Sequence, residues 1–111
     1  MFNPMEMLGK LKEMQSEMEK AKERLNDITV VGESGGGMVK VTVNANRKVL
    51  KIEVDPELVS KEDKEMMEDL ITAAVNLAIE KAEETAREEI NKISSGMIPN
   101  IPGFDLSNLG K

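Results

Sequence analysis

The 111-residue chain contains no cysteine, histidine, tryptophan or tyrosine, and phenylalanine occurs only twice. The missing cysteines exclude disulfide bonds and are typical of a protein kept in a reducing compartment. Without histidine or cysteine, most metal sites and most nucleophile–base pairs cannot be built. We therefore expect a binding or assembly protein rather than an enzyme, with no catalytic residues, no metal site and no cofactor.

Long apolar runs are absent as well. No apolar stretch approaches the roughly 18 residues that span a membrane. The first nine residues also lack the basic segment followed by an apolar segment that marks a secretory signal. We therefore expect a cytoplasmic protein that has no membrane partner.

A heptad pattern of apolar residues occupies the N-terminal quarter of the chain. These residues recur at alternating spacings of four and three, which indicates a helix that packs along one narrow seam. Asn3 and Pro4 suit the N-cap and first turn of this helix, which is predicted to run from about Pro4 to Asn26 or Asp27. The residues of the seam are Met7, Leu11, Met14, Met18, Ala21, Leu25 and Ile28.

Three short segments after this helix are predicted to be β-strands. The β-branched run at 28–31 is the first, and the glycine-rich segment that begins at Gly32 is expected to break it. Two alternating runs, 39–43 and 50–54, flank a short Asn-containing turn and predict a hairpin. We expect one face of this hairpin to be buried against a helix. That face carries Val39, Val41, Val43, Leu50, Ile52 and Val54.

The second half of the chain predicts one long helix. Ser60 and Asp63 resemble a capping box, so the helix is expected from about Lys61 to Ile93, where the Ser-Ser-Gly sequence at 94–96 should stop it. Its centre is apolar on more than one side, and we expect it to be the packing centre of the protein, with Ile71 and Leu77 buried.

The predicted element order is α-β-β-β-α, an α+β fold in which a long N-terminal and a long C-terminal helix accompany a three-stranded antiparallel sheet. Residues 1–96 are expected to form a single domain, and residues 97–111 an irregular tail. A chain of this size buries only about two-thirds of its unfolded surface. The apolar surface left over on so small a sheet favours a homodimer.

Two other features could suggest an enzyme. Gly35, Gly36 and Gly37 are followed by a strand and by no Lys-Ser/Thr pair, so they indicate a turn with positive φ rather than a phosphate loop. The many carboxylates of the second helix have no histidine beside them and are typical of a solvated face.

Charge is distributed unevenly. Acidic residues outnumber basic ones, and the formal net charge of −6 opposes phosphate binding. Residues 38–54 nevertheless hold four basic residues against one acid, and the first helix carries further basic residues. Ordinary solubilising charge is one interpretation, and contact with DNA phosphates is the other. The candidate DNA-contacting residues are Lys10, Lys12, Lys20, Lys22, Arg24, Lys40, Arg47, Lys48 and Lys51. Because only two aromatic residues are available for base stacking, duplex DNA is the favoured nucleic acid.

Four blocks of the sequence resemble the YbaB/EbfC family of bacterial nucleoid-associated proteins. They are residues 31–41 (VGESGGGMVKV), 52–58 (IEVDPEL), 63–74 (DKEMMEDLITAA) and 94–97 (SSGM), the last followed by PGF at 102–104. The resemblance implies a homodimer with helices that project at both ends like tweezers. It also implies binding of double-stranded DNA with loose sequence preference, mainly through those helices, with no catalytic activity and no cofactor.

These observations predict a homodimeric, cytoplasmic protein that binds duplex DNA at the nucleoid through backbone contacts, with a regulatory or nucleoid-organising role and no small-molecule substrate. The alternative is a protein-interaction or chaperone-like scaffold module. The methionine-rich seam and the spaced apolar residues of the tail favour this alternative. The end of the heptad pattern near Ile28 argues against it.

Overall fold

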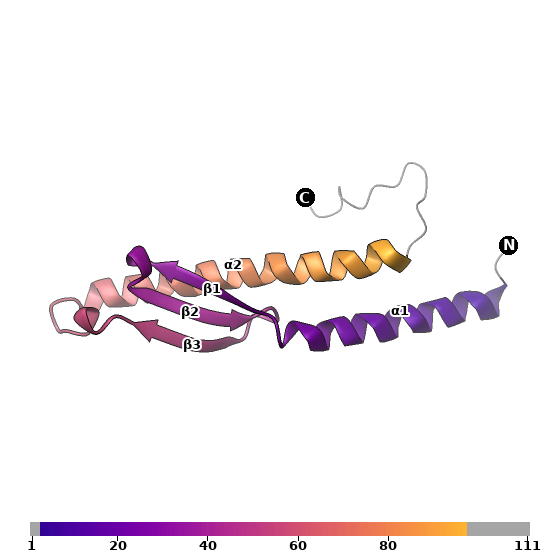
Figure 1. Cartoon of the computed structure of the whole chain (residues 1–111), viewed down its shortest axis with the longest axis horizontal. Helices are drawn as coiled ribbons and strands as arrows, with labels where there is room; N and C mark the ends of the chain where they lie inside the picture. Colours follow the sequence, from indigo (N-terminus) through magenta and orange to yellow (C-terminus); the bar gives the residue numbers. More distant parts are fainter. Residues whose placement is uncertain (1–2, 98–111) are drawn as a thin grey trace.

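The computed structural model describes residues 3–97 and has the element order α-β-β-β-α (Figure 1). This order confirms the predicted α+β fold class. The strands form one antiparallel sheet in the order β1-β2-β3. The elements are α1 (Pro4–Leu25), β1 (Thr29–Ser34), the 3₁₀ turn η1 (Gly35–Gly37), β2 (Val39–Asn44), β3 (Val49–Val54), the 3₁₀ turn η2 (Pro56–Leu58) and α2 (Lys64–Met97).

The molecule is elongated, with principal dimensions of 70 × 27 × 15 Å. The first half of α2 runs along the sheet, and its second half continues beyond the end of the sheet (Figure 1). Helix α1 extends from that same end, so the two helices project in one direction from a common base. Neither described helix is apolar enough along its length to cross a membrane.

The core lies between α2 and the first two strands. Val39, Val41 and Val43 of β2 are fully buried. They face a stripe of small residues that recur every four positions on α2, namely Ala74, Ala78 and Ala82, which are also fully buried. The short side chains of this stripe allow the backbone of α2 to come close to the sheet.

The backbone of α2 comes very close to the backbone of β1 at Gly32. A Cβ atom at this position would lie 2.4 Å from the amide nitrogen of Ala78 and 2.5 Å from the carbonyl oxygen of Ala74. The prediction that the first strand breaks at Gly32 was wrong, because β1 continues to Ser34. The glycine is needed inside the strand for the contact between backbones, and the turn begins only at Gly35. Positive φ angles of 61°, 67° and 92° at Gly35, Gly36 and Gly37 confirm the predicted glycine turn.

Strand β3 departs from the prediction. Leu50 and Ile52 are 49% and 47% exposed, so the expectation that a helix buries them was wrong for a single subunit. Strands lie about 4.8 Å apart and a helix is about 10 Å wide, so one helix covers two strands. Helix α2 lies over β1 and β2 and has few contacts with β3. Leu77 of α2 is also 42% exposed, contrary to expectation.

The ends of α2 differ from the prediction as well. Ser60 and Asp63 make the capping contacts that their spacing indicates, because the Asp63 amide donates to the Ser60 hydroxyl at 3.1 Å. The helix proper nevertheless begins at Lys64. Its predicted end at Ile93 was wrong, because the helix continues to Met97. Serine and glycine weaken a helix by about 1 kcal/mol or less per residue, which does not force it to end. The predicted tail beyond Met97 lies outside the described residues.

Candidate nucleic-acid interface

Two of the predicted basic residues, Lys40 and Lys51, lie on the face of the sheet away from α2, and both are paired with acids. The Lys51 ammonium lies 2.8 Å from a carboxylate oxygen of Glu53, and the Lys40 ammonium lies 3.8 Å from Glu33. The hydrogen bond and the attraction between Lys51 and Glu53 raise the pKa of Lys51 and lower the pKa of Glu53. This face is therefore close to neutral, and it attracts a phosphate only weakly.

The turn between β2 and β3 is organised by one buried side chain. The side-chain oxygen of Asn44 accepts hydrogen bonds from the amides of Asn46 and Lys48, both at 3.0 Å. The Arg47 amide donates to the Asn44 carbonyl at 2.9 Å. This geometry places Arg47 in the left-handed region, with φ of 67°, which costs a residue with a side chain roughly 1–2 kcal/mol. Strain of this kind is often retained at functional positions.

The same turn is tied to the end of α1. The side-chain amide of Asn46 donates to the Lys22 carbonyl at 3.1 Å and to the Asn26 side-chain oxygen at 2.6 Å. The Ala45 amide donates to the carbonyls of Leu25 and Ile28 at 3.1 and 2.9 Å. These bonds fix the hairpin turn beside the last turn of α1, although the two segments are about twenty residues apart in the sequence.

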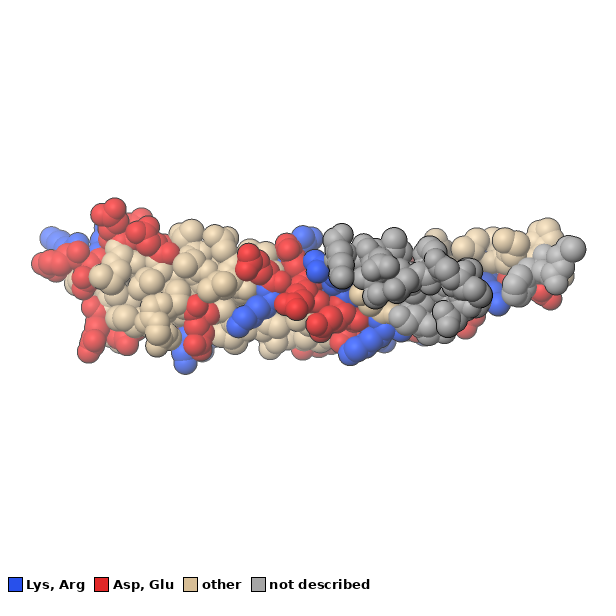
Figure 2. Space-filling model, turned by 90° about the horizontal axis from the view of Figure 1, so that it is seen from above, with Lys and Arg blue, Asp and Glu red and all other residues tan. Residues whose placement is uncertain are grey.

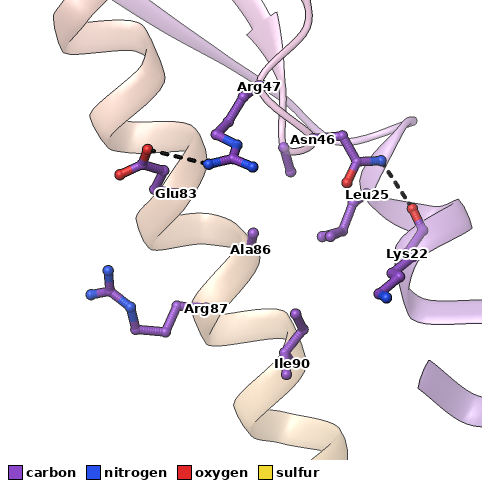
Figure 3. Close-up of a pocket in the computed structure, with 9 residues that line it drawn as sticks. Lys22, Leu25, Asn46, Arg47, Glu83, Ala86, Arg87 and Ile90 are labelled. Atoms are coloured by element: carbon purple, nitrogen blue, oxygen red, sulfur yellow. Dashed lines mark hydrogen bonds and ion pairs between the residues drawn. The ribbon is translucent and has the colours of Figure 1, made fainter. Parts of the chain in front are cut away.

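A hollow of about 340 Å³ opens where α1, the hairpin turn and α2 meet. Its interior is apolar, with Ala86 and Ile90 of α2 facing Leu25 of α1 across the space (Figure 3). Its rim is charged and includes Lys22 from α1, Arg47 from the turn, and Glu83 and Arg87 from α2. We call this feature the junction hollow.

Basic residues outnumber acids on the rim of the junction hollow. Arg47 lies 3.6 Å from Glu83, and both side chains are about half exposed or more. Arg87 lies one helical turn beyond Glu83 and extends outward from α2 (Figure 3). Its side chain makes no hydrogen bond or ion pair with the part of the chain that the structure describes. After the Arg47–Glu83 pair is formed, two cations remain on the rim.

Arg87 was not among the residues predicted from the sequence. Its neighbours along α2 include Glu83, Glu84, Glu88 and Glu89, so the local sequence charge is negative. Only the contact between α2 and the hairpin turn brings Arg87 to the same hollow as Arg47 and Lys22. Its spacing of four from Glu83 is the one sequence signal that places the two side chains on the same side of the helix.

The remaining predicted residues do not gather at one place. Lys10, Lys12, Lys20 and Arg24 are exposed along α1, and at 100° per residue they point in several directions. Lys20 lies 3.6 Å from Glu17. Lys48 is exposed at the hairpin turn. The structure therefore brings together Lys22 from the helix set and Arg47 from the hairpin set, and it leaves the others dispersed.

One face of the molecule is unsuited to DNA. Acidic side chains gather over the middle of α2 when the molecule is seen from above, with a few basic side chains beside them (Figure 2). Such a face repels phosphates. A DNA-binding surface therefore has to lie on another side.

Comparison with known proteins gives consistent results. Residues 1–97 match the model of the YbaB/EbfC DNA-binding family. A nucleoid-associated protein from Chlorobium phaeobacteroides (strain BS1) is 46% identical over 106 residues, which cover 96% of this chain and 94% of that protein. Another, from Caldanaerobacter subterraneus subsp. tengcongensis, is 45% identical over 103 residues, which cover 93% of this chain and 91% of the relative.

The fold is also shared with a solved structure. The crystal structure of an uncharacterized protein from Helicobacter pylori superposes with a TM-score of 0.75 and is 26% identical, and the match covers 85% of this chain and 99% of that one. The sequence and structural matches extend over nearly the whole described chain. The chain therefore belongs to the YbaB/EbfC DNA-binding family.

Proposed function

We propose that this protein binds double-stranded DNA at the bacterial nucleoid, that it acts as a homodimer, and that it contacts the phosphate backbone. Membership of a DNA-binding family and the names of the bacterial relatives support this proposal. The observation that carries the site is that Lys22, Arg47 and Arg87, which come from three separate elements, all line the junction hollow. The cellular role that fits such binding is organisation of the nucleoid or regulation of its genes.

Arginine suits this role because its planar guanidinium donates two parallel hydrogen bonds to a phosphate. In the free protein the Arg47 guanidinium forms an ion pair with the Glu83 carboxylate. A phosphate of the DNA backbone takes the place of this carboxylate, and Arg87 and Lys22 supply further positive charge elsewhere on the rim. Contacts of this kind carry no sequence information, which gives binding with loose sequence preference.

The basic residues outside the junction hollow are proposed as auxiliary contacts. They lie along α1 and on the hairpin and none of them lines the junction hollow, so each is expected to contribute less than Arg47 or Arg87. Lys20, Lys40 and Lys51 are in addition paired with acids, as Arg47 is with Glu83. The net charge of −6 opposes binding at long range. We therefore expect weak affinity that falls steeply as salt rises, and a homodimer compensates by presenting two junction hollows to one duplex. The auxiliary residues are Lys10, Lys12, Lys20, Arg24, Lys40, Lys48 and Lys51.

Titration of duplex DNA at several salt concentrations tests the proposal. In the double variant Arg47→Ala/Arg87→Ala, affinity should fall at least about tenfold, and the salt dependence should lose close to one log–log unit for each phosphate contact removed. The matched control is Lys61→Ala/Lys64→Ala, which removes the same charge just before and at the N-terminal end of α2. Both pairs are exposed, so unfolding curves should stay close to those of the parent. Equal affinity and equal salt slope for the two double variants would show that the junction hollow does not bind DNA.

A second comparison separates α1 from the hairpin. One variant replaces Lys20, Lys22 and Arg24 with alanine, and another replaces Arg47 and Lys48. Because each set contains one residue of the junction hollow, both variants should bind more weakly than the parent and by similar amounts on unrelated DNA sequences. Unchanged binding by both variants would exclude both basic sets.

The exposed apolar residues of α1 favour one alternative, a protein-interaction or scaffold module. Met5, Met7, Leu8 and Leu11 are between 54% and 83% exposed, and methionine-rich surfaces accept varied partners. If the parent protein shows no salt-sensitive binding to duplex DNA, this alternative replaces the DNA-binding proposal.

A further inference from the structure

The first half of α2 carries a row of apolar residues on its outer side. Met66, Leu70, Ala73 and Leu77 recur at spacings of four, three and four, which places them along one side of the helix. Met66 is 52% exposed and Leu77 is 42% exposed. Ala73 is also exposed, and Leu70 is partly buried. We call these four residues the α2 stripe.

The α2 stripe borders the edge of β1. The Leu70 carbonyl accepts a hydrogen bond from the Ser34 hydroxyl of β1 at 2.6 Å. The Lys81 ammonium, one helical turn after Leu77, donates to the Val31 carbonyl of β1 at 2.9 Å. Strands β1 and β3 are at opposite ends of the strand order. The stripe therefore lies on the side of α2 toward β1 and away from the uncovered residues of β3.

The geometry of the α2 stripe suits a second helix. Its residues span about 16 Å of α2 at 1.5 Å per residue, and their alternating spacing is the one that receives the apolar residues of a partner helix in a coiled coil. A strand is a poorer fit, because a lysine at a sheet edge opposes strand addition and Lys81 occupies the edge of β1 beside the stripe.

Acidic residues surround the α2 stripe. Glu80 and Glu84 occupy the next two positions of the same seam, and Asp69 lies beside it. All three are exposed, and none of them forms an ion pair with a residue that the structure describes. Seen from above, an uncharged area over the strands and the first half of α2 is bordered by acidic side chains (Figure 2). An apolar surface with an acidic border is the result.

Charge complementarity selects the occupant of this surface. Two copies of the α2 stripe packed against each other would bring their acidic borders together, and like charges brought together across an interface oppose association. DNA is repelled by the same acids. A helix that carries basic residues on both sides of its own apolar seam meets neither obstacle, because each of its cations faces a carboxylate.

We propose that the α2 stripe binds a basic amphipathic helix of another protein. The apolar side chains of that helix pack between the residues of the stripe, and its lysines and arginines pair with Asp69, Glu80 and Glu84. This inference goes beyond DNA binding and does not depend on it. The stripe and its acidic border share no residue with the junction hollow, so one molecule can hold DNA and the partner helix together.

A synthetic peptide provides the direct test. The probe is a helical peptide about three heptads long, with leucine at the seam positions and lysine at the flanking positions. Its binding is measured by titration calorimetry in the absence of DNA at low and high salt. A peptide with the same leucines and with glutamate in place of each lysine is the matched control. The basic peptide should bind at least about tenfold more tightly than the acidic one, and salt should weaken its binding.

Two variants of the protein locate the binding surface. Met66→Ser/Leu77→Ser removes apolar contacts and should weaken binding of the basic peptide at least about tenfold. Glu80→Gln/Glu84→Gln retains the apolar seam and should weaken binding several-fold while reducing its salt dependence. The matched control is Leu8→Ser/Leu11→Ser on α1, where the exposed fractions are 54% and 58%, and it should bind like the parent. Because the substituted residues are exposed, the fold should persist, which circular dichroism checks.

Three outcomes would overturn the proposal. Equal binding of the basic and acidic peptides, or unchanged binding by both variants of the α2 surface, would show that this surface is not a site for a basic helix. A loss of binding in Leu8→Ser/Leu11→Ser alone would place the peptide on α1. Sedimentation of the parent as a species larger than a dimer, reversed by Met66→Ser/Leu77→Ser, would identify a further copy of the chain as the occupant. Because DNA is absent, these outcomes are independent of the titrations that test DNA binding.

Discussion

Replacing Gly32 with alanine is the most direct test of the packing between α2 and the sheet. The added Cβ would lie 2.4 Å from a backbone nitrogen, whereas ordinary contacts begin near 3.4 Å, so α2 has to retreat by about 1 Å. A retreat of this size forfeits a quarter to a half of the dispersion energy of each contact affected. Those contacts belong to the fully buried residues of β2 and α2.

Overpacking of a core typically costs about 1–3 kcal/mol. The obstruction here is backbone, which cannot rotate away as a side chain can. We therefore expect a loss of about 3 kcal/mol in the free energy of unfolding. For a domain of this size the loss lowers the melting temperature by roughly 12–24 °C.

The assay is urea denaturation followed by circular dichroism at one fixed protein concentration, because the proposed dimerisation would make stability depend on concentration. Two other glycines serve as controls. A Cβ at Gly36 meets nothing within 4 Å but φ there is 67°, so Gly36→Ala should cost only about 1 kcal/mol. Gly9 lies in α1 with open space around it, so Gly9→Ala should stabilise by about 1 kcal/mol. If Gly32→Ala is no more destabilising than Gly36→Ala, the close packing of α2 on β1 is refuted.

Three further predictions concern charge and the C-terminus. Glu83→Gln frees Arg47, so DNA affinity should rise a few-fold, whereas Glu84→Gln, which does not line the junction hollow, should give a smaller rise; equal effects in titrations would contradict the role of Glu83. Lys51 lowers the pKa of Glu53 below its ordinary value of 4.5. The ion pair therefore stabilises the fold above pH 4.5, and this contribution is lost as the pH falls through the lower pKa that Glu53 has in the folded state. The variant Glu53→Gln should melt slightly below the parent at neutral pH and at the same temperature as the parent in strong acid. Deletion of residues 98–111 should leave the melting temperature and the sedimentation of the proposed dimer unchanged, because every helix and strand that the structure describes lies between Pro4 and Met97; unfolding or loss of the dimer on truncation would show that the segment contributes to the core.

Local sequence patterns predicted the identity and order of every helix and strand in the described residues 3–97. The heptad pattern, the alternating valines of β2 and the glycine turn each indicate a local conformation through their spacing, which a single sequence reports well. The predicted packing along the heptad seam was wrong for a single subunit over its first turns, because Met7 and Leu11 are more than half exposed. The predictions failed where a distant element decides the outcome. Gly32 indicated a break, but the backbone of α2 requires a glycine there within the strand.

The burial of β3 could not be predicted for a related reason. Its apolar alternation correctly indicated a face meant for burial, but the pattern does not reveal whether the covering surface belongs to the same chain. Only the position of α2 over β1 and β2 shows that a single subunit leaves Leu50 and Ile52 uncovered. The candidate site was limited in the same way, since the negative charge of the neighbouring residues in the sequence concealed Arg87, which the fold places on the same hollow as Arg47.

The projection of α1 beyond the sheet has a consequence for the distribution of stability within the molecule. Only Ala21 and Leu25, near its C-terminal end, are buried, so tertiary packing holds the last turns and leaves the first turns to the intrinsic propensity of an isolated helix. Such segments open locally at a small fraction of the global free energy of unfolding. The amides of the first half of α1 therefore exchange with solvent far sooner than those facing the sheet, and this half of the helix can adjust its shape to a bound surface without disturbing the core.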